Sequence, residues 1–500
     1  MLFNSHLFNS PRREAQYGCV PRHAPFTFFL VALFVLLRIL TGGRDAGPQG
    51  NNIMVILAGL GILATLIIVN RPIALVLIVF DMLDFAGWIN PEAWGLPAYF
   101  KFKDLEYILL MVTGIVGLAF IPRLRLPRKT AIYRAMVFFA LIVSIYILYT
   151  LTFQGVSLTF RVARNLLYYT LFFIIPFYIR SMSEVDIALK GFFILMFASS
   201  VSHIAQTVFF PIHTLLPYMQ SSELADGLVR LWGPSQPFNF IGLPVLFGVY
   251  LQRKKTIIAF GICLLASILT FARIHIAYFG ISMVVVLLLL SETKLRFSRV
   301  IRVLGIISLF YSVVWILLGA YAKEDLVIKT VSDRMADTQT QFKTREGTFF
   351  SHIEYAFQAP LLIKYAGGSL LWGLGYQGLP YSNILGGGEI QEEFIPTFNS
   401  DNGWAGIIVS MGIIGILVFS FFLITVTKHI FRIARHAKVE QVRILSASLF
   451  AFFFMSWFLW FFSALGIWQD SAVVVAVALG LLNRAFFLEI KKPKNEHAIS

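Results

Sequence analysis

The chain has 500 residues, of which 58% are hydrophobic and only 13% are charged, and its mean hydropathy is +0.77. Soluble domains are typically about a quarter charged, so this composition excludes a soluble globular protein and predicts an all-α bundle of transmembrane helices. The formal net charge of +15 does not indicate nucleic acid as a partner, because the basic residues stand in short clusters between apolar runs.

The N-terminal tail, residues 1–24, carries Arg12, Arg13 and Arg22 ahead of a first apolar run. A cleaved signal peptide would need a small-residue cleavage site and a soluble mature chain. The small residues at 41–43 are followed by more apolar sequence. We therefore interpret the first apolar run as an uncleaved span.

Apolar runs of spanning length then follow one another and predict about fourteen transmembrane helices. We assign residues 25–321 to transmembrane helices 1–11, residues 322–403 to one large loop, residues 404–488 to helices 12–14 and residues 489–500 to a C-terminal tail. The runs around Arg71 and Arg273 also fit re-entrant hairpins. The predicted spans are 25–41, 53–70, 72–89, 105–122, 132–153, 164–180, 189–211, 238–252, 256–272, 274–291, 301–321, 404–427, 444–467 and 470–488.

Lysine and arginine residues divide unequally between alternate connections. If the N-terminus is cytoplasmic, the cytoplasmic connections collect the clusters at 123–134, 253–255 and 428–443, and the short outer loops hold far fewer basic residues. Basic loops stay in the cytoplasm, so both termini are predicted to be cytoplasmic. The basic residues of the short outer loops are Arg44, Lys101, Lys103, Arg161, Arg164, Arg230 and Arg273.

Three of these outer arginines indicate a ligand. Arg161 and Arg164 precede a span and would share one helix face, and Arg273 stands between two apolar runs with almost no loop around it. Each alone fits snorkelling of a long cation towards headgroups. Together they favour a phosphate or diphosphate on a lipid carrier, because a planar guanidinium binds two oxygens at once.

The large loop contains a charged stretch at 323–346, an amphipathic segment at 349–365 and several glycine pairs. The charged stretch is typical of a solvated surface, and the amphipathic segment predicts a helix lying on the membrane. The glycines at 367–368, 373–375 and 386–388 predict tight turns. They follow no strand of a βαβ unit, which argues against a dinucleotide site.

Asp401 and Asn402 end the loop, where the next span begins. Asp401 fits the N-cap position of the next helix, and this role does not exclude a catalytic role. Asp81 and Asp84 lie within a predicted span, where acids are functional candidates, although a structural pairing with an outer arginine fits as well. The histidines lack metal-ligand spacing and the two cysteines lack a partner, so we predict no metal site and no disulfide.

The order of these features resembles the O-antigen ligase and polymerase superfamily of bacterial envelope glycosyltransferases. The likeness covers about residues 265–420, and elsewhere only hydrophobic spans correspond. Family ligases usually have His-Asn where this chain has Asp401-Asn402, and many polymerases have Asp-Asn, so the pair favours a polymerase. The features that carry the resemblance are Thr270 to Arg273 opening a span, Arg345 in the loop, Pro360 followed by Gly373-Leu374-Gly375-Tyr376, Asp401-Asn402, and the glycine-spaced run Met411-Gly412-Ile413-Ile414-Gly415.

The resemblance implies glycosyl transfer without metal or cofactor at the periplasmic face of the bacterial inner membrane. The donor would be a glycan on undecaprenyl diphosphate in membrane lipid, the acceptor a sugar hydroxyl, and a chain-length regulator a further partner. Asp401 is the first candidate base and His352 the second, with no side-chain base as a third option. The implied diphosphate ligands are Arg161, Arg164, Arg273 and Arg345, the last two also catalytic, and the implied glycan contacts are Gly373, Gly375, Tyr376 and Asn402.

Two alternative functions stay open at this point. A ligase of the same superfamily would attach finished glycan to a lipid or protein acceptor. A polysaccharide flippase or transporter would need a cationic path through the membrane interior, whereas the arginines gather at the predicted outer face.

Overall fold

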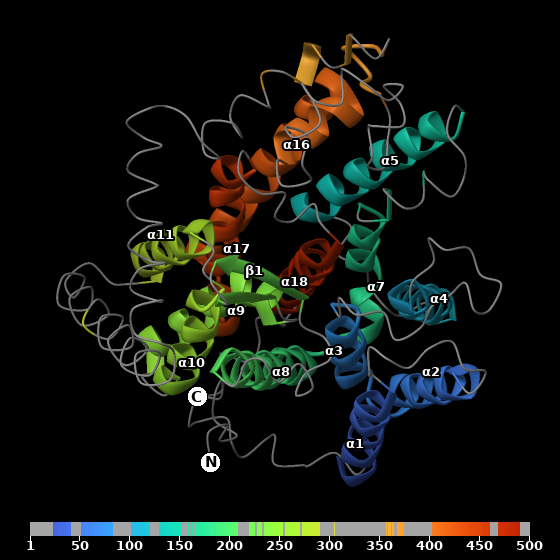
Figure 1. Cartoon of the computed structure of the whole chain (residues 1–500), viewed down its shortest axis with the longest axis vertical. Helices are drawn as coiled ribbons and strands as arrows, with labels where there is room; N and C mark the ends of the chain where they lie inside the picture. Colours follow the sequence, from blue (N-terminus) through green and yellow to red (C-terminus); the bar gives the residue numbers. More distant parts are fainter. Residues whose placement is uncertain are drawn as a thin grey trace.

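A computed structural model describes residues 24–41, 52–83, 102–120, 130–152, 159, 163–164, 166–208, 220–225, 228–232, 235–253, 256–270, 273–290, 305, 357, 359–361, 363–364, 368–374, 403–460 and 469–490. These residues are mostly helical (Figure 1). Five helical segments among them are long and apolar enough to cross a membrane, which makes the chain a helical membrane protein. They are Ala131–Leu151, Met182–Ala205, Gly403–His436, Glu440–Leu459 and Ser471–Ile490.

The described helices follow the predicted spans, with three differences. The predicted span 164–180 is divided into the 3₁₀ helix η3 and the short helix α7; α8 begins at Met182 and α16 continues to His436. The predicted span 301–321 lies outside the described residues except for residue 305. The helices are α1 Ala24–Thr41, α2 Asn52–Val69, α3 Arg71–Asp81, α4 Phe102–Phe120, α5 Ala131–Leu151, η3 Tyr168–Thr170, α7 Leu171–Tyr178, α8 Met182–Val208, α9 Ser235–Arg253, α10 Ile257–Ile268, α11 Arg273–Leu290, α16 Gly403–His436, α17 Glu440–Leu459 and α18 Gln469–Ile490.

A short antiparallel ribbon, β1 Gln220–Ala225 and β2 Leu228–Trp232, lies between α8 and α9 in the chain and is a small addition to a fold that is otherwise helical, as the sequence predicts. Gln220 pairs with Trp232 and Ser222 with Arg230. The two strands are separated by Asp226-Gly227 in the sequence, a pair that favours the tight turn of a hairpin.

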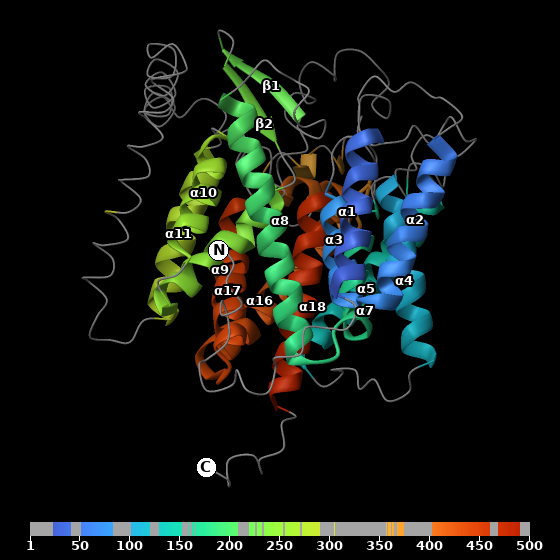
Figure 2. The same ribbon diagram turned by 90° about the horizontal axis from the view of Figure 1, so that it is seen from below.

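The direction of the helices defines two ends of the bundle (Figure 2). Helices α9 and α11 run parallel, because Phe240 packs on His275 near their starts while Gly248 approaches Leu290 near their ends. Helix α16 runs antiparallel to α17, and its start at Trp404 packs on Trp460. We call the end where α9, α11 and α16 begin, and where β1 and β2 lie, the ribbon end.

Basic residues separate between the two ends as the sequence predicts. Arg164 and the start of α11 at Arg273 belong to the ribbon end. The end opposite to it holds the start of α3 at Arg71, Arg180 after α7, and Arg484 near the end of α18. That the opposite end faces the cytoplasm stays a prediction.

Large apolar side chains cover much of the outside of the bundle. Ile68 on α2 and Phe120 on α4 are 85% and 80% exposed. Contact of these side chains with water would be unfavourable, whereas contact with lipid chains would not. Between helices, small residues permit close approach: a Cβ on Gly114 of α4 would lie 2.6 Å from the Cβ of Ile174 on α7.

Candidate functional site

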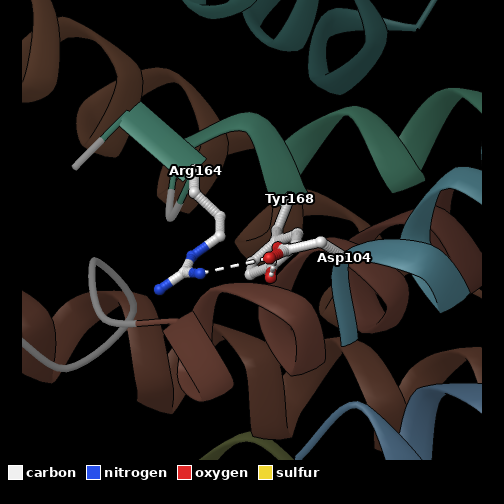
Figure 3. A network of polar contacts seen from close by, with 3 residues as sticks. All are labelled: Asp104, Arg164 and Tyr168. Carbon is white, nitrogen blue, oxygen red and sulfur yellow. Dashed lines mark hydrogen bonds and ion pairs between the residues drawn. The ribbon is translucent and has the colours of Figure 1, made fainter. Parts of the chain in front are cut away.

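Arg164 forms a buried ion pair at the ribbon end (Figure 3). Its Nη1 lies 3.2 Å from Oδ2 of Asp104, and the hydroxyl of Tyr168 donates to the other oxygen, Oδ1, at 3.0 Å. The two charged side chains are 9% and 13% exposed. Asp104 stands in the first turn of α4, where the helix dipole also favours a negative charge. The carboxylate is therefore stabilised from three directions.

This ion pair joins α4 to the start of the segment that continues into α7. Tyr107, one turn after Asp104, shares a hydrogen bond of 2.6 Å with the hydroxyl of Thr170 and donates to the carbonyl of Leu167. Its ring packs edge-on against Tyr168 at 5.2 Å. The contacts seen for Arg164 thus hold two helices together, and a phosphate at Arg164 would compete with Asp104. The predicted role of Arg164 as a diphosphate ligand stays a prediction.

A chain of buried polar groups fixes the turn between α10 and α11. The Asn239 amide donates to the Ser267 hydroxyl at 2.8 Å, and the Thr270 hydroxyl donates to the Ser267 carbonyl at 2.8 Å. Nδ1 of His275 approaches the Thr270 hydroxyl to 3.4 Å. Buried polar groups hold one geometry when they are hydrogen-bonded. These contacts therefore link the end of α10 to the start of α11, the helix that begins at Arg273, at the ribbon end.

Helix α16 is interrupted at Gly412, whose φ of 60° and ψ of −151° are not helical. Residues 368–374 of the large loop lie against this interruption, and we call the contact the clamp. Ile413 and Ile414 donate their amides to the carbonyls of Leu370 and Leu371 at 3.0 and 3.2 Å, and the amide of Leu374 donates to the carbonyl of Val409 at 2.7 Å. The loop thus replaces the helical hydrogen bonds that the interruption removes.

Glycine is required on both sides of the clamp. A Cβ on Gly412 would lie 2.5 Å from the carbonyl oxygen of Leu370, and a Cβ on Gly373, with φ of 73°, would lie 2.6 Å from the carbonyl oxygen of Val409. Both backbones are in the left-handed region that other residues rarely adopt. Gly373, a predicted glycan contact, therefore packs against the main chain of α16.

Side chains from α5 support the clamp. The hydroxyl of Tyr146 donates to the carbonyl of Met411 at 2.8 Å, next to the interruption. The rings of Tyr146 and Tyr149 lie 6.0 and 6.2 Å from the ring of Trp372. Irregular backbone at membrane depth is stable only where protein or water satisfies it. Here the loop and Tyr146 do so.

A tryptophan cluster fixes the start of α16. Trp404 donates its main-chain amide to the carbonyl of Trp460 at 3.0 Å and its indole NH to the carbonyl of Trp457 at 3.1 Å. Asp401 and Asn402 directly precede this helix in the sequence. The predicted site residues that lie outside the described residues are Arg161, Arg345, His352, Gly375, Tyr376, Asp401 and Asn402.

The predicted intramembrane acid Asp81 is the last residue of α3 and is 9% exposed, while Asp84 lies outside the described residues. Among the side chains that the structure describes, no three of His, Cys, Asp or Glu gather as a metal ion would require. Comparison of the chain with models of known protein families and with curated proteins found no match.

Sequence reasoning missed three kinds of residue that build the ribbon end. Asp104 lies at a helix start close to Lys101 and Lys103, where a carboxylate is typical of a solvated surface. Asn239 and Ser267 lie in apolar runs where single polar residues carry little signal. The Tyr146 hydroxyl donates to the carbonyl of Met411, which lies next to the helix interruption, and the sequence does not reveal that interruption.

Removing the charge of Asp104 tests the buried ion pair. Asp104→Asn leaves the guanidinium of Arg164 without its compensating charge, and we expect a loss of roughly 3 kcal/mol of stability, read as a lower apparent Tm in detergent. Lys190→Gln breaks the more exposed pair with Asp186 and should cost at most about 1 kcal/mol. Equal effects of the two variants would contradict a buried, structural role for the Arg164–Asp104 pair.

A methyl group at Gly412 tests the clamp. Gly412→Ala forces a side chain into the left-handed region and against the Leu370 carbonyl, and we expect it to cost at least about 2 kcal/mol in thermal unfolding. Gly406→Ala is the matched control on the same helix, because a Cβ there meets nothing within 4 Å. That variant should be neutral or slightly stabilising. An unchanged Tm in Gly412→Ala would count against the clamp.

Proposed function

We propose that the protein is a glycosyltransferase that polymerises oligosaccharide repeat units carried on undecaprenyl diphosphate. In this proposal about fourteen helices cross the bacterial inner membrane, both termini are cytoplasmic and the loop 322–403 is periplasmic. The observation that carries the proposal is the clamp. It attaches the large loop to the end of the bundle at which α11 begins with Arg273.

The clamp also restricts the part of the loop that carries the candidate base. The amide of Leu374 is hydrogen-bonded to the carbonyl of Val409 on α16. Trp404, five residues before Val409 on that helix, is hydrogen-bonded to Trp460. Leu374 and Gly403, the described residues that flank the segment with Asp401, therefore both lie at the first turns of α16. Five helical residues span about 7.5 Å, so the two attachment points are close. A catalytic group needs such positioning.

The proposed reaction uses this end as follows. A sugar hydroxyl of the acceptor attacks the anomeric carbon of the donor, a new glycosidic C–O bond forms, and the bond to the diphosphate breaks. Asp401 takes the hydroxyl proton, and undecaprenyl diphosphate leaves with the bonding electron pair. Arg273 and Arg345 stabilise the negative charge that develops on the diphosphate. The Asp-Asn pair at 401–402 supports polymerisation over ligation through the resemblance described above.

Arg273→Gln tests this function directly. The purified protein, reconstituted with undecaprenyl-diphosphate-linked oligosaccharide, should extend the glycan, and the variant should be slower by about 100-fold or more, because it lacks one group that stabilises the leaving diphosphate. Arg435→Gln at the opposite end should retain activity. Equal rates for wild type and Arg273→Gln would contradict the assignment, and loss of wild-type activity with a chelator would contradict metal-free transfer.

A further inference from the structure

Three arginines from separate segments meet at the opposite end of the bundle. Arg71 is the first residue of α3, Arg180 lies between α7 and α8, and Arg484 is close to the end of α18. The guanidinium carbons of Arg71 and Arg180 each lie 5.6 Å from the ring centre of Phe177. One aromatic ring is thus contacted by two cations, and their charges interact, because Arg71 contributes to the lowered pKa of Arg180.

The third arginine fixes the backbone of this cluster. Nε of Arg484 donates to the carbonyl of Ile179 at 2.9 Å, and Nη2 donates to the carbonyl of Arg180 at 3.4 Å. Arg484 is only 4% exposed. It therefore acts as a support that sets the position of Arg180, whereas Arg71 and Arg180 are themselves only partly buried.

Among the described residues, the cluster carries more positive than negative charge. The carboxylate of Glu184 lies beside the cluster and accepts a hydrogen bond from the main-chain amide of Arg180. The main-chain amide of Glu184 donates to the Ser181 hydroxyl, so these residues cap the start of α8. Burial, and after it the charge of Arg71, lowers the pKa of Arg180, with Glu184 opposing. An additional anion would relieve the repulsion between the guanidinium groups.

The start of α3 adds to the attraction for an anion. Arg71 occupies the first helical position, so the partial positive charge of the helix N-terminus lies beside its side chain. Helix α3 packs along α8 with the same direction, since Arg71 at the start of α3 and Arg180 just before α8 lie over the same ring, and Gly191 approaches Val76 further along the two helices. The positive ends of these two helices therefore lie at the same end of the bundle.

Apolar surface that suits lipid chains adjoins the cluster. Ile68, three residues before Arg71, is 85% exposed, and Phe120, at the end of α4, is 80% exposed. Gly117 of α4 lies directly against the ring of Phe177, where a Cβ would clash, so the exposed end of α4 is held next to the arginines. A charged group bordered by exposed apolar side chains matches an amphipathic ligand rather than a free anion.

We propose that Arg71 and Arg180 bind the phosphate headgroup of an anionic phospholipid, whose acyl chains lie along α2 and α4. The guanidinium forks supply paired donors for phosphate oxygens, and Arg484 and Phe177 hold the forks in place. The site is at the end of the bundle opposite to Arg164 and Arg273, so it is separate from the proposed transferase site.

Lipid binding to the purified full-length protein tests this site. In native mass spectrometry from a neutral detergent, the wild type should bind the first phosphatidylglycerol about tenfold more tightly than phosphatidylcholine, and the variant R71Q/R180Q should lose that preference. Arg435→Gln is the matched control, since Arg435 also lies over a ring, Phe431, at the same end but stands outside the cluster. It should keep the preference.

Two outcomes would overturn the proposal. One is an unchanged preference in R71Q/R180Q; the other is full displacement of phosphatidylglycerol by inorganic phosphate, which would identify a free-phosphate site. If the variant R71Q/R180Q fails to fold, a measurement on the wild type alone still tests the proposal. The preference of the wild type for phosphatidylglycerol should fall as salt rises from about 50 mM to about 500 mM, and a salt-independent preference would contradict binding through arginines.

Discussion

Main-chain hydrogen bonds between residues 368–374 and the interrupted helix α16 organise the ribbon end. An interruption in a membrane helix exposes amides and carbonyls that lipid cannot satisfy. Leu370, Leu371 and Leu374 supply the missing partners, and two glycines let the two backbones touch. The interruption and the loop therefore depend on each other: neither conformation is favourable alone.

The other polar contacts at this end serve the same arrangement. The Tyr146 hydroxyl caps the carbonyl of Met411 beside the interruption, and Trp404 ties the start of α16 to the end of α17. The Arg164–Asp104 pair joins α4 to the segment before α7, and the buried chain through Ser267 links α9 and the end of α10 to the start of α11. A transferase that works on a membrane-bound donor needs a rigid frame of this kind, because misplacement of reacting groups is costly.

The two ends of the bundle differ in how they use arginine. At the ribbon end, Arg164 is balanced by a carboxylate. At the opposite end, Arg71 and Arg180 share one ring beside exposed apolar surface. Arg164 thus pairs with a carboxylate of another helix, whereas Arg71 and Arg180 lie over a ring, and the ligand proposed for them is an anion. The number of arginines in a loop does not distinguish these cases. The difference depends on whether a carboxylate or an aromatic ring of another segment lies next to each arginine.

Apolar runs and charge clusters were sufficient to predict most of the described helices and the separation of basic residues between the two ends. They did not predict the interruption at Gly412, because a glycine with positive φ looks the same in sequence as a helical glycine, and its partner segment lies some 40 residues upstream. The partner of Arg164 is more distant still, 60 residues away on α4. The ribbon does have a local signal, because the Asp226-Gly227 pair between the two strands favours a hairpin turn.

Hydrogen exchange of the wild-type protein measures the clamp most directly. If the loop segment is bonded to α16, the amides of Gly373, Leu374, Ile413 and Ile414 should be protected together, to a degree similar to that of the buried part of α17. Exchange of residues 369–374 at the rate of an unstructured peptide, with α16 still protected, would contradict the clamp. It would also remove the support that the clamp gives to the proposed function.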